Sequence, residues 1–375
     1  MKIVADENIP LLREFFAGFG TLTTCPGRGL SPADVADADV LLVRSVTRVG
    51  PELLRDSRVR FVGTATIGTD HLDLPWLAQA GIHVASAPGC NARAVAEYVV
   101  AALLELCAAP PAGQVLGVIG LGNVGSQVAR LAAVLGWQVI GCDPFVQRVG
   151  IRQLPLTGLL AGADVVSLHT PLTRSGPHAT WHLLGAAELD LLKPGAILLN
   201  SGRGPVVDNA ALLARLAAGR LRAVLDVWEG EPTLLPGLIE RVALGSPHIA
   251  GYSLDGKWRG TQQVYEALCQ HLGQPAARRH EDFVPAQAGP AVSLPAQGGY
   301  WESLRSAVRQ AYDIRRDDLA LRQVQSQVSP PAGFDELRRH YPARREFPAH
   351  RLILPAGHIA RSALATLGFQ LLESS

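Results

Sequence analysis

Three side chains of this sequence could together run an acid–base reaction. Arg203 stands in the loop SGRG, Glu231 in WEGEP and His248 in SPHIAG. Histidine can take a proton near neutral pH, and a carboxylate on its far nitrogen fixes the tautomer and favours the imidazolium. A planar guanidinium can grip a substrate carboxylate through two hydrogen bonds and polarise the adjacent C2 oxygen. The three residues therefore predict oxidation of a 2-hydroxy acid to a 2-oxo acid.

Taken singly, each residue has a structural interpretation that is more common than the catalytic one. An arginine after a strand is usually a solvated cation, a glutamate beside proline is usually a loop residue, and a histidine in an apolar run usually belongs to the core. The catalytic interpretation depends on the three occurring together, downstream of a second motif.

The second motif is the glycine-rich turn GLGNVG at residues 120–125, which directly follows the apolar run VLGVIG. This order of strand, glycines and helix is typical of a dinucleotide site. Gly120 permits the tight turn, Gly122 lets the backbone approach a pyrophosphate, and Gly125 lets the helix pack closely on the sheet.

The residues around this turn indicate which dinucleotide binds. The free N–H groups of Asn123 and Val124 would point at the phosphates from the start of the helix. Asp143 follows the next expected strand, where a carboxylate can bind the ribose hydroxyls and would repel a 2′-phosphate. The cofactor is therefore expected to be NAD rather than NADP.

Short apolar runs alternate with helical patterns over the first 270 residues. Continuous apolar runs are typical of parallel strands buried on both faces, and the alternation predicts right-handed βαβ units. Arg203, Glu231 and His248 then follow strand ends, where open α/β sheets bind their ligands. The expected strands are residues 2–6, 40–45, 60–66, 82–87, 115–120, 137–142, 164–170, 196–201 and 223–227. The expected helices include residues 91–109, 123–135, 208–218 and 260–272.

Two series of strands predict two α/β lobes, each with a doubly wound parallel sheet. We expect a flavodoxin-like substrate lobe and a Rossmann NAD lobe, followed by a small α+β C-terminal domain. That domain has helical patterns at 301–312 and 357–371 around a middle rich in proline and arginine. The expected bounds are 1–92 plus 262–285 for the substrate lobe, 93–261 for the NAD lobe and 286–375 for the C-terminal domain.

The composition excludes several classes of protein. Hydrophobic residues make up 48% of the 375 residues and charged residues 18%, which is too apolar for a mainly disordered chain. The net charge of +1 provides no field for nucleic acid or an anionic membrane. Five widely spaced cysteines without a CxxC favour a reduced, cytoplasmic protein with no zinc framework, and no metal site is expected. No apolar run is long enough to span a membrane.

Five segments resemble the D-isomer-specific 2-hydroxyacid dehydrogenase family, and the resemblance covers about residues 1–270. It implies that Arg203, Glu231 and His248 form the active site, with His248 as the acid/base. It also implies a homodimer. The segments are GLGNVG with Asp143, HTPLT (169–173), LKPGAILLNSGRGPVVD (192–208), LDVWEGEP (225–232) and PHIAG (247–251). The implied contacts on the nicotinamide side are Thr170, Gly202, Asp226 and Gly251.

Other segments resemble one branch of this family, which oxidises 4-phospho-D-erythronate in pyridoxal phosphate biosynthesis. In that branch a C-terminal extension of about 90 residues serves dimerisation. The resemblance implies substrate contacts at Ser45, Thr66 and Tyr252. The segments are KIVADENIP (2–10), VRSVTRV (43–49), GTATIGTDHLD (63–73) and HIAGYSLDGKWRGT (248–261). The candidate cations for a phosphate are Arg44, Arg48, Lys257 and Arg259, of which at least two are expected to be surface residues.

Two alternatives remain open from the sequence. One is another D-2-hydroxyacid dehydrogenase, for example one acting on 3-phosphoglycerate, although the C-terminal segment lacks the βαββαβ pattern often found in such enzymes. The other is a non-catalytic, NAD-sensing scaffold that binds protein partners. Such a scaffold would need no site for a substrate phosphate.

Overall fold

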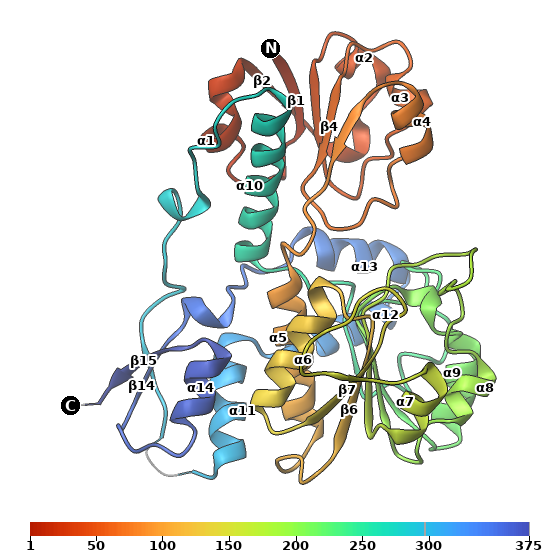
Figure 1. Cartoon of the computed structure of the whole chain (residues 1–375), viewed down its shortest axis with the longest axis vertical. Coiled ribbons are helices and arrows are strands. Elements are labelled where there is room, and N and C mark those ends of the chain that lie inside the picture. The colour runs from red at the N-terminus through yellow and green to blue at the C-terminus, as the bar shows by residue number, and fades with distance from the viewer. Residues whose placement is uncertain (296–297, 375) are drawn as a thin grey trace. The chain divides into compact units, whose positions relative to one another are not determined.

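The computed structural model describes residues 1–295 and 298–374, which divide into two compact units (Figure 1). The first unit comprises Met1–Asn91 and Ser253–Ala286, and the second comprises Ala92–Tyr252 and Gln287–Ser375. Residues 253–261, placed with the NAD lobe in the sequence analysis, thus group with the first unit. The C-terminal segment groups with the second unit. The functional division into three domains stays a prediction.

The first unit contains one five-stranded parallel sheet in the order β2-β1-β3-β4-β5. This is the strand order of a flavodoxin-like lobe, as predicted from the sequence. The strands are β1 (Lys2–Asp6), β2 (Thr21–Cys25), β3 (Val40–Val43), β4 (Phe61–Thr64) and β5 (His83–Ala85).

Alternate residues along these strands fill two separate cores, because successive side chains point to opposite faces of a sheet. Ile3 and Leu42 pack in one core with α1 and α10, whereas Val4 and Leu41 pack in the other with α2, α3 and α4. The sheet is therefore covered on both faces. The helices are α1 (Leu12–Phe16), α2 (Pro32–Val35), α3 (Pro51–Leu54), α4 (Leu74–Gln79) and α10 (Leu254–His271).

The second unit contains a seven-stranded sheet in the order β12-β11-β10-β9-β6-β7-β8, with every pair parallel. Strand order reverses between β6 and β9, which is the switch point of a Rossmann fold. The strands are β6 (Val115–Ile119), β7 (Gln138–Cys142), β8 (Arg152–Gln153), β9 (Val165–Leu168), β10 (Ile197–Asn200), β11 (Arg222–Leu225) and β12 (Leu244–Gly245).

Helices cover both faces of this sheet as well. Leu116 and Val118 share a core with α5 and α6, and Val166 and Leu198 share the opposite core with α7 and α9. The expected fold class, two doubly wound α/β lobes with a small C-terminal α+β domain, is confirmed. The helices are α5 (Ala92–Leu106), α6 (Asn123–Val134), α7 (Leu156–Gly162), α8 (Ala186–Asp190) and α9 (Asn209–Ala217).

The C-terminal segment packs into the same core as α5 and α6. Trp301 and Phe347 are buried in that core, and the Trp301 indole N–H donates to the Cys107 carbonyl at 2.7 Å. The middle of this segment, for which the sequence predicts no helix, forms α12 and α13. The elements are β13 (Val292–Ser293), α11 (Tyr300–Ala311), α12 (Ile314–Gln325), α13 (Pro330–Arg339), β14 (Arg351–Leu354), α14 (Arg361–Leu367) and β15 (Gln370–Glu373).

Two other features bear on the sequence expectations. All five cysteines are free thiols. Among the described residues, no helix is both long enough and apolar enough to cross a membrane.

Candidate active site

The residues predicted for the second unit gather at one edge of its sheet, because every strand there is parallel and the carboxyl ends meet at one edge. Gly120 follows β6, Thr170 follows β9, Arg203 follows β10, Asp226 follows β11 and His248 follows β12. The structure therefore brings the glycine turn and the candidate catalytic residues of this unit to the edge where α/β folds bind ligands.

His248 and Glu231 are in direct contact. The His248 Nδ1 lies 2.5 Å from Glu231 Oε1, and Glu231 Oε2 accepts a hydrogen bond from the Trp228 backbone N–H at 3.1 Å. Burial of Glu231 opposes its ionisation, but the charge and hydrogen bond of His248, the Trp228 N–H and the charge of Arg338 hold the pKa of Glu231 below its ordinary value. An ionised Glu231 on Nδ1 leaves Nε2 as the nitrogen that can exchange a proton with a ligand.

The loop that carries His248 is fixed by the buried carboxylate of Asp226. His248 has a positive φ of 57°, a conformation that non-glycine residues rarely adopt. Asp226, 1% exposed, accepts hydrogen bonds from the Ser246 hydroxyl at 2.7 Å and from the Ile249 and Ala250 N–H groups at 2.7 and 3.0 Å. Burial raises the pKa of Asp226. The structure thus gives Asp226 a scaffolding role, and its contact with nicotinamide stays a prediction.

Arg203 stands in a tight loop that a neighbouring amide holds. Asn200 accepts from the Gly202 N–H at 3.1 Å through Oδ1 and donates to the Arg203 carbonyl at 3.0 Å through Nδ2. A Cβ at Gly204 would lie 2.1 Å from the backbone carbonyl of Trp228, so only glycine fits there. Asn200 was missed by the sequence analysis, because an asparagine at a strand end has no distinctive spacing.

The glycine turn has the shape that a dinucleotide requires. Gly120 has a φ of 86°, and a Cβ at Gly125 would lie 1.8 Å from the Gly120 carbonyl oxygen, whereas a Cβ at Gly122 would meet open space. Asn123 and Val124 are the first residues of α6. Asp143 accepts from the Leu121 N–H at 2.7 Å, which places its carboxylate beside the turn.

The nicotinamide side also fits a polar ligand. The Thr170 hydroxyl oxygen is buried and has no hydrogen-bond partner in the part of the chain that the structure describes. A buried hydroxyl without a partner costs stability, which a ligand amide would recover. Gly202 lies beside it, since a Cβ there would be 3.1 Å from the Thr170 carbonyl oxygen. Gly251 follows the two residues whose N–H groups bind Asp226.

The first unit holds a second set of predicted residues. Arg44 pairs with the fully buried Asp6, with Nε 3.0 Å from Oδ2. Burial lowers the pKa of Lys257, and the nearby positive charge of Arg44 lowers it further. Two neighbouring cations of this kind could bind an anion such as a phosphate. Ser45 is exposed beside Arg44, and the Thr66 hydroxyl lies 2.7 Å from that of Thr64.

A cluster that includes Glu229, two residues before Glu231, contains groups that could bind a metal ion. One ligand atom each of His182, Asp208 and Glu229 lies within 4.8 Å of the others. His182 Nε2 lies 2.7 Å from Glu229 Oε1, so a hydrogen bond already accounts for the contact. The expectation of no metal site stays a prediction.

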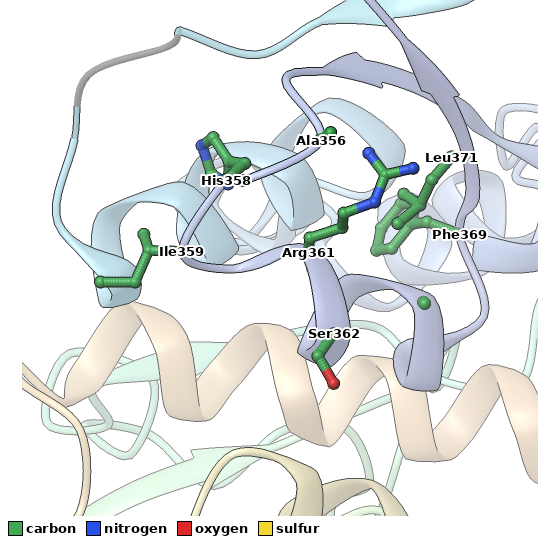
Figure 2. Close-up of a pocket in the computed structure, with 9 residues that line it drawn as sticks. Ala356, His358, Ile359, Arg361, Ser362, Phe369 and Leu371 are labelled. Carbon is green, nitrogen blue, oxygen red and sulfur yellow. The ribbon is translucent and has the colours of Figure 1, made fainter.

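The C-terminal segment, far along the sequence from these residues, contains a pocket with a volume of about 660 Å³. Figure 2 shows the residues that line it. His358, Ile359, Arg361 and Phe369 help to line it. None of the predicted site residues lines this pocket, so it is separate from the candidate active site.

Comparison with known proteins shows the family to which the chain belongs. Residues 94–250 match the family described as D-isomer specific 2-hydroxyacid dehydrogenase, NAD binding domain, and residues 283–368 match a domain of unknown function (DUF3410). The chain belongs to the D-isomer specific 2-hydroxyacid dehydrogenase family and is an NAD-dependent oxidoreductase. The family and the cofactor expected from the motifs are confirmed.

One relative indicates which enzyme of this family the chain is most usefully compared with. The chain is 52% identical over 353 residues to erythronate-4-phosphate dehydrogenase of Pseudomonas entomophila (strain L48), which covers 92% of both chains.

Solved structures agree on the fold. The TT0316 protein of Thermus thermophilus is 28% identical with a TM-score of 0.64, and covers 74% of this chain and 99% of its own. D-lactate dehydrogenase of Aquifex aeolicus, solved with NAD and lactic acid, is 25% identical with a TM-score of 0.60, and covers 73% and 96%.

Proposed function

We propose that the chain oxidises 4-phospho-D-erythronate at C2 to (R)-3-hydroxy-2-oxo-4-phosphooxybutanoate, with NAD as the oxidant, in vitamin B6 biosynthesis. The observation that carries the chemistry is the contact of His248 Nδ1 with Glu231 Oε1 at 2.5 Å, at the strand edge that also carries Arg203. The identity of 52% to an enzyme named erythronate-4-phosphate dehydrogenase supports the choice of substrate.

Each of the three side chains has a separate role in this reaction. His248 takes the proton of the C2 hydroxyl on Nε2, and Glu231 stabilises the imidazolium that forms. Arg203 binds the substrate carboxylate and polarises the C2 oxygen. NAD, when bound, accepts the hydride that leaves C2.

The cofactor would be held by the residues around the glycine turn and on the nicotinamide side. Asn123 and Val124 offer N–H groups to the pyrophosphate, and Asp143 offers its carboxylate to the ribose hydroxyls. The remaining proposed contacts are Gly120, Gly122, Gly125, Thr170, Gly202, Asp226 and Gly251.

The substrate phosphate would bind at the pair of cations in the first unit. A dianionic phosphate between Arg44 and Lys257 would offset the repulsion between the two cations and raise the lowered pKa of Lys257. We propose Ser45, Thr66 and Tyr252 as further substrate contacts. The arrangement favours a phosphorylated acid over an unphosphorylated one such as D-lactate.

The test compares substrates on purified protein. Turnover of 4-phosphoerythronate should exceed that of 3-phosphoglycerate and D-lactate, and preference for either of the other two acids would overturn the proposed substrate. His248→Ala should lower kcat by roughly 10² to 10⁴, the usual contribution of a general acid–base. Turnover of the variant near that of the wild type between pH 6 and 9 would remove His248 from the mechanism.

We further propose that the protein is a cytoplasmic homodimer. The five free thiols favour a reducing compartment. Light scattering on the full chain should give about twice the 39.8 kDa mass of one chain. A monomer at micromolar concentration would contradict the proposed dimer.

A further inference from the structure

Helix α13 of the C-terminal segment brings an arginine to the catalytic loops. Phe334 of this helix is fully buried in the core that contains Trp228 and Leu225, at the end of β11. Leu337 packs against the same core. These contacts place the last turn of α13 beside the loop of Glu231, within the second unit.

Arg338 in this last turn lies next to a proposed substrate contact. Its guanidinium carbon is 5.9 Å from the ring centroid of Tyr252, a distance typical of a cation–π contact. The Tyr252 ring also meets Tyr341 edge-on, with the centroids 5.8 Å apart and the planes at 84°. The C-terminal segment thus contacts the Tyr252 ring through both Arg338 and Tyr341.

Arg338 is half-buried and contains a buried donor without a partner, which favours a role beyond stability. Its Nε is buried and has no hydrogen-bond partner among the residues that the structure describes. A buried N–H donor without an acceptor costs stability, and an apolar side chain of similar volume would avoid this cost. Burial lowers the pKa of Arg338, yet Tyr252 and Glu231 outweigh burial and hold that pKa above its ordinary value.

We propose that Arg338 is a positioning residue of the active site: it holds the Tyr252 ring and places a positive charge beside the Glu231–His248 pair. The C-terminal segment then supplies part of the catalytic environment, in addition to any role in dimerisation. This inference rests on the proposed function. Arg338 acts through Glu231 and Tyr252 and does not touch the reacting atoms.

Other charged and titratable groups also reach this pair. Asp226, at the end of β11, acts on His248, and Asp335 of α13 acts on Arg338. Both are acidic. Arg338 is therefore the positive charge from α13 that opposes formation of the imidazolium, while Glu231 favours it.

The test replaces Arg338 with methionine and with lysine, and compares Arg339→Met as a control on the same helix. Arg339 is exposed and pairs with Glu336, outside the site. Arg338→Met should lower kcat/KM about tenfold or more and move the acid limb of its pH profile upward by about 0.5 to 1 pH unit, because loss of the cation favours the imidazolium. Arg338→Lys should keep the limb in place but still lower kcat/KM, because an ammonium lacks the planar fork. Arg339→Met should match the wild type.

The outcomes separate this inference from the proposed function. If Arg338→Met keeps the wild-type pH limb and a kcat/KM within twofold, the positioning role is wrong, whatever the change in urea midpoint. If Arg338→Met does not fold, a lysine variant with wild-type kcat and KM would overturn the contact with Tyr252. Failure of the wild type to oxidise the phosphorylated acid would instead contradict the proposed function, and the best acid of the substrate panel would then test Arg338.

Discussion

Replacing Glu231 by glutamine tests the central contact of the site, because the change keeps the shape of the side chain and removes its charge. The Glu231–His248 pair is joined at 2.5 Å, and the two side chains are only 25% and 31% exposed. A hydrogen bond between charged groups contributes about 1.5 to 3 kcal/mol. One pH unit corresponds to about 1.4 kcal/mol, so the lost stabilisation of the imidazolium moves its deprotonation by roughly one to two pH units.

The direction of the shift follows from the reaction. Oxidation needs a neutral imidazole, and without the anionic partner the imidazolium loses its proton at lower pH. The acid limb of the kcat/KM profile should therefore move downward by about one to two pH units. The plateau of kcat should fall roughly 10- to 100-fold, because the transition state already carries part of the transferred proton.

The assay is NADH formation at 340 nm between pH 5 and 10, with Glu229→Gln as the matched control. Glu229 stands two residues from Glu231 and also contacts a histidine, His182, at 2.7 Å. Its replacement should leave the acid limb in place. A Glu231→Gln profile whose acid limb coincides with that of the wild type would refute the reasoning.

Three further changes probe other parts of the chain. Arg203→Lys should lower kcat at least about tenfold as well as raise KM, since an ammonium cannot form the planar fork; a pure KM effect would contradict the proposed role. Asp143→Ala should reduce the preference for NAD over NADP in kcat/KM. An unchanged preference for NAD would mean that another group binds the ribose hydroxyls. Burial raises the pKa of Asp317 to about 6, although the Tyr312 and Tyr341 hydroxyls donate to it. The contribution of Asp317 to the free energy of unfolding is present below about pH 4 and is lost as the pH rises through 6. Between pH 4 and 7, the free energy of unfolding of Asp317→Asn, measured with urea, should therefore rise by about 2 to 3 kcal/mol relative to that of the wild type. Parallel pH dependences of the two proteins would contradict this.

The parallel strands could be predicted because both of their faces are buried. Residues 40–43 and 165–168 are buried at every position, which makes them continuous apolar runs in the sequence. Strand β2, TLTTC, was missed because it lies at the sheet edge and is largely exposed, with three threonines among its five residues. Its position comes from pairing with β1, a long-range contact that residue types do not reveal.

The candidate site could be proposed from the sequence where residue types alone carry the chemistry. The glycine turn and Arg203, Glu231 and His248 are such residues, and the parallel sheet gathers them at one edge. The hydrogen-bonding scaffold around them was not predictable, because Asn200 and Ser246 are ordinary polar residues until the fold places them beside a loop. Ser246 bridges Asp226 at 2.7 Å and the Tyr98 hydroxyl at 2.8 Å, across 148 residues of sequence.

The C-terminal segment is the least predictable part of the candidate site for the same reason. The Asp318 carboxylate accepts from the Gly245 N–H at 2.8 Å, and the Arg344 guanidinium donates to the Ala250 carbonyl at 3.1 Å. These contacts hold the loop of His248 at both ends, from positions 73 and 94 residues away. In the sequence, Asp318 and Arg344 belong to a stretch rich in charge and proline that has the composition of a solvated surface. Both residues bind backbone groups, so the side chains of the loop give no indication of these contacts in the sequence. Only the folded second unit shows that the loop of His248 is held in place by a distant part of the chain.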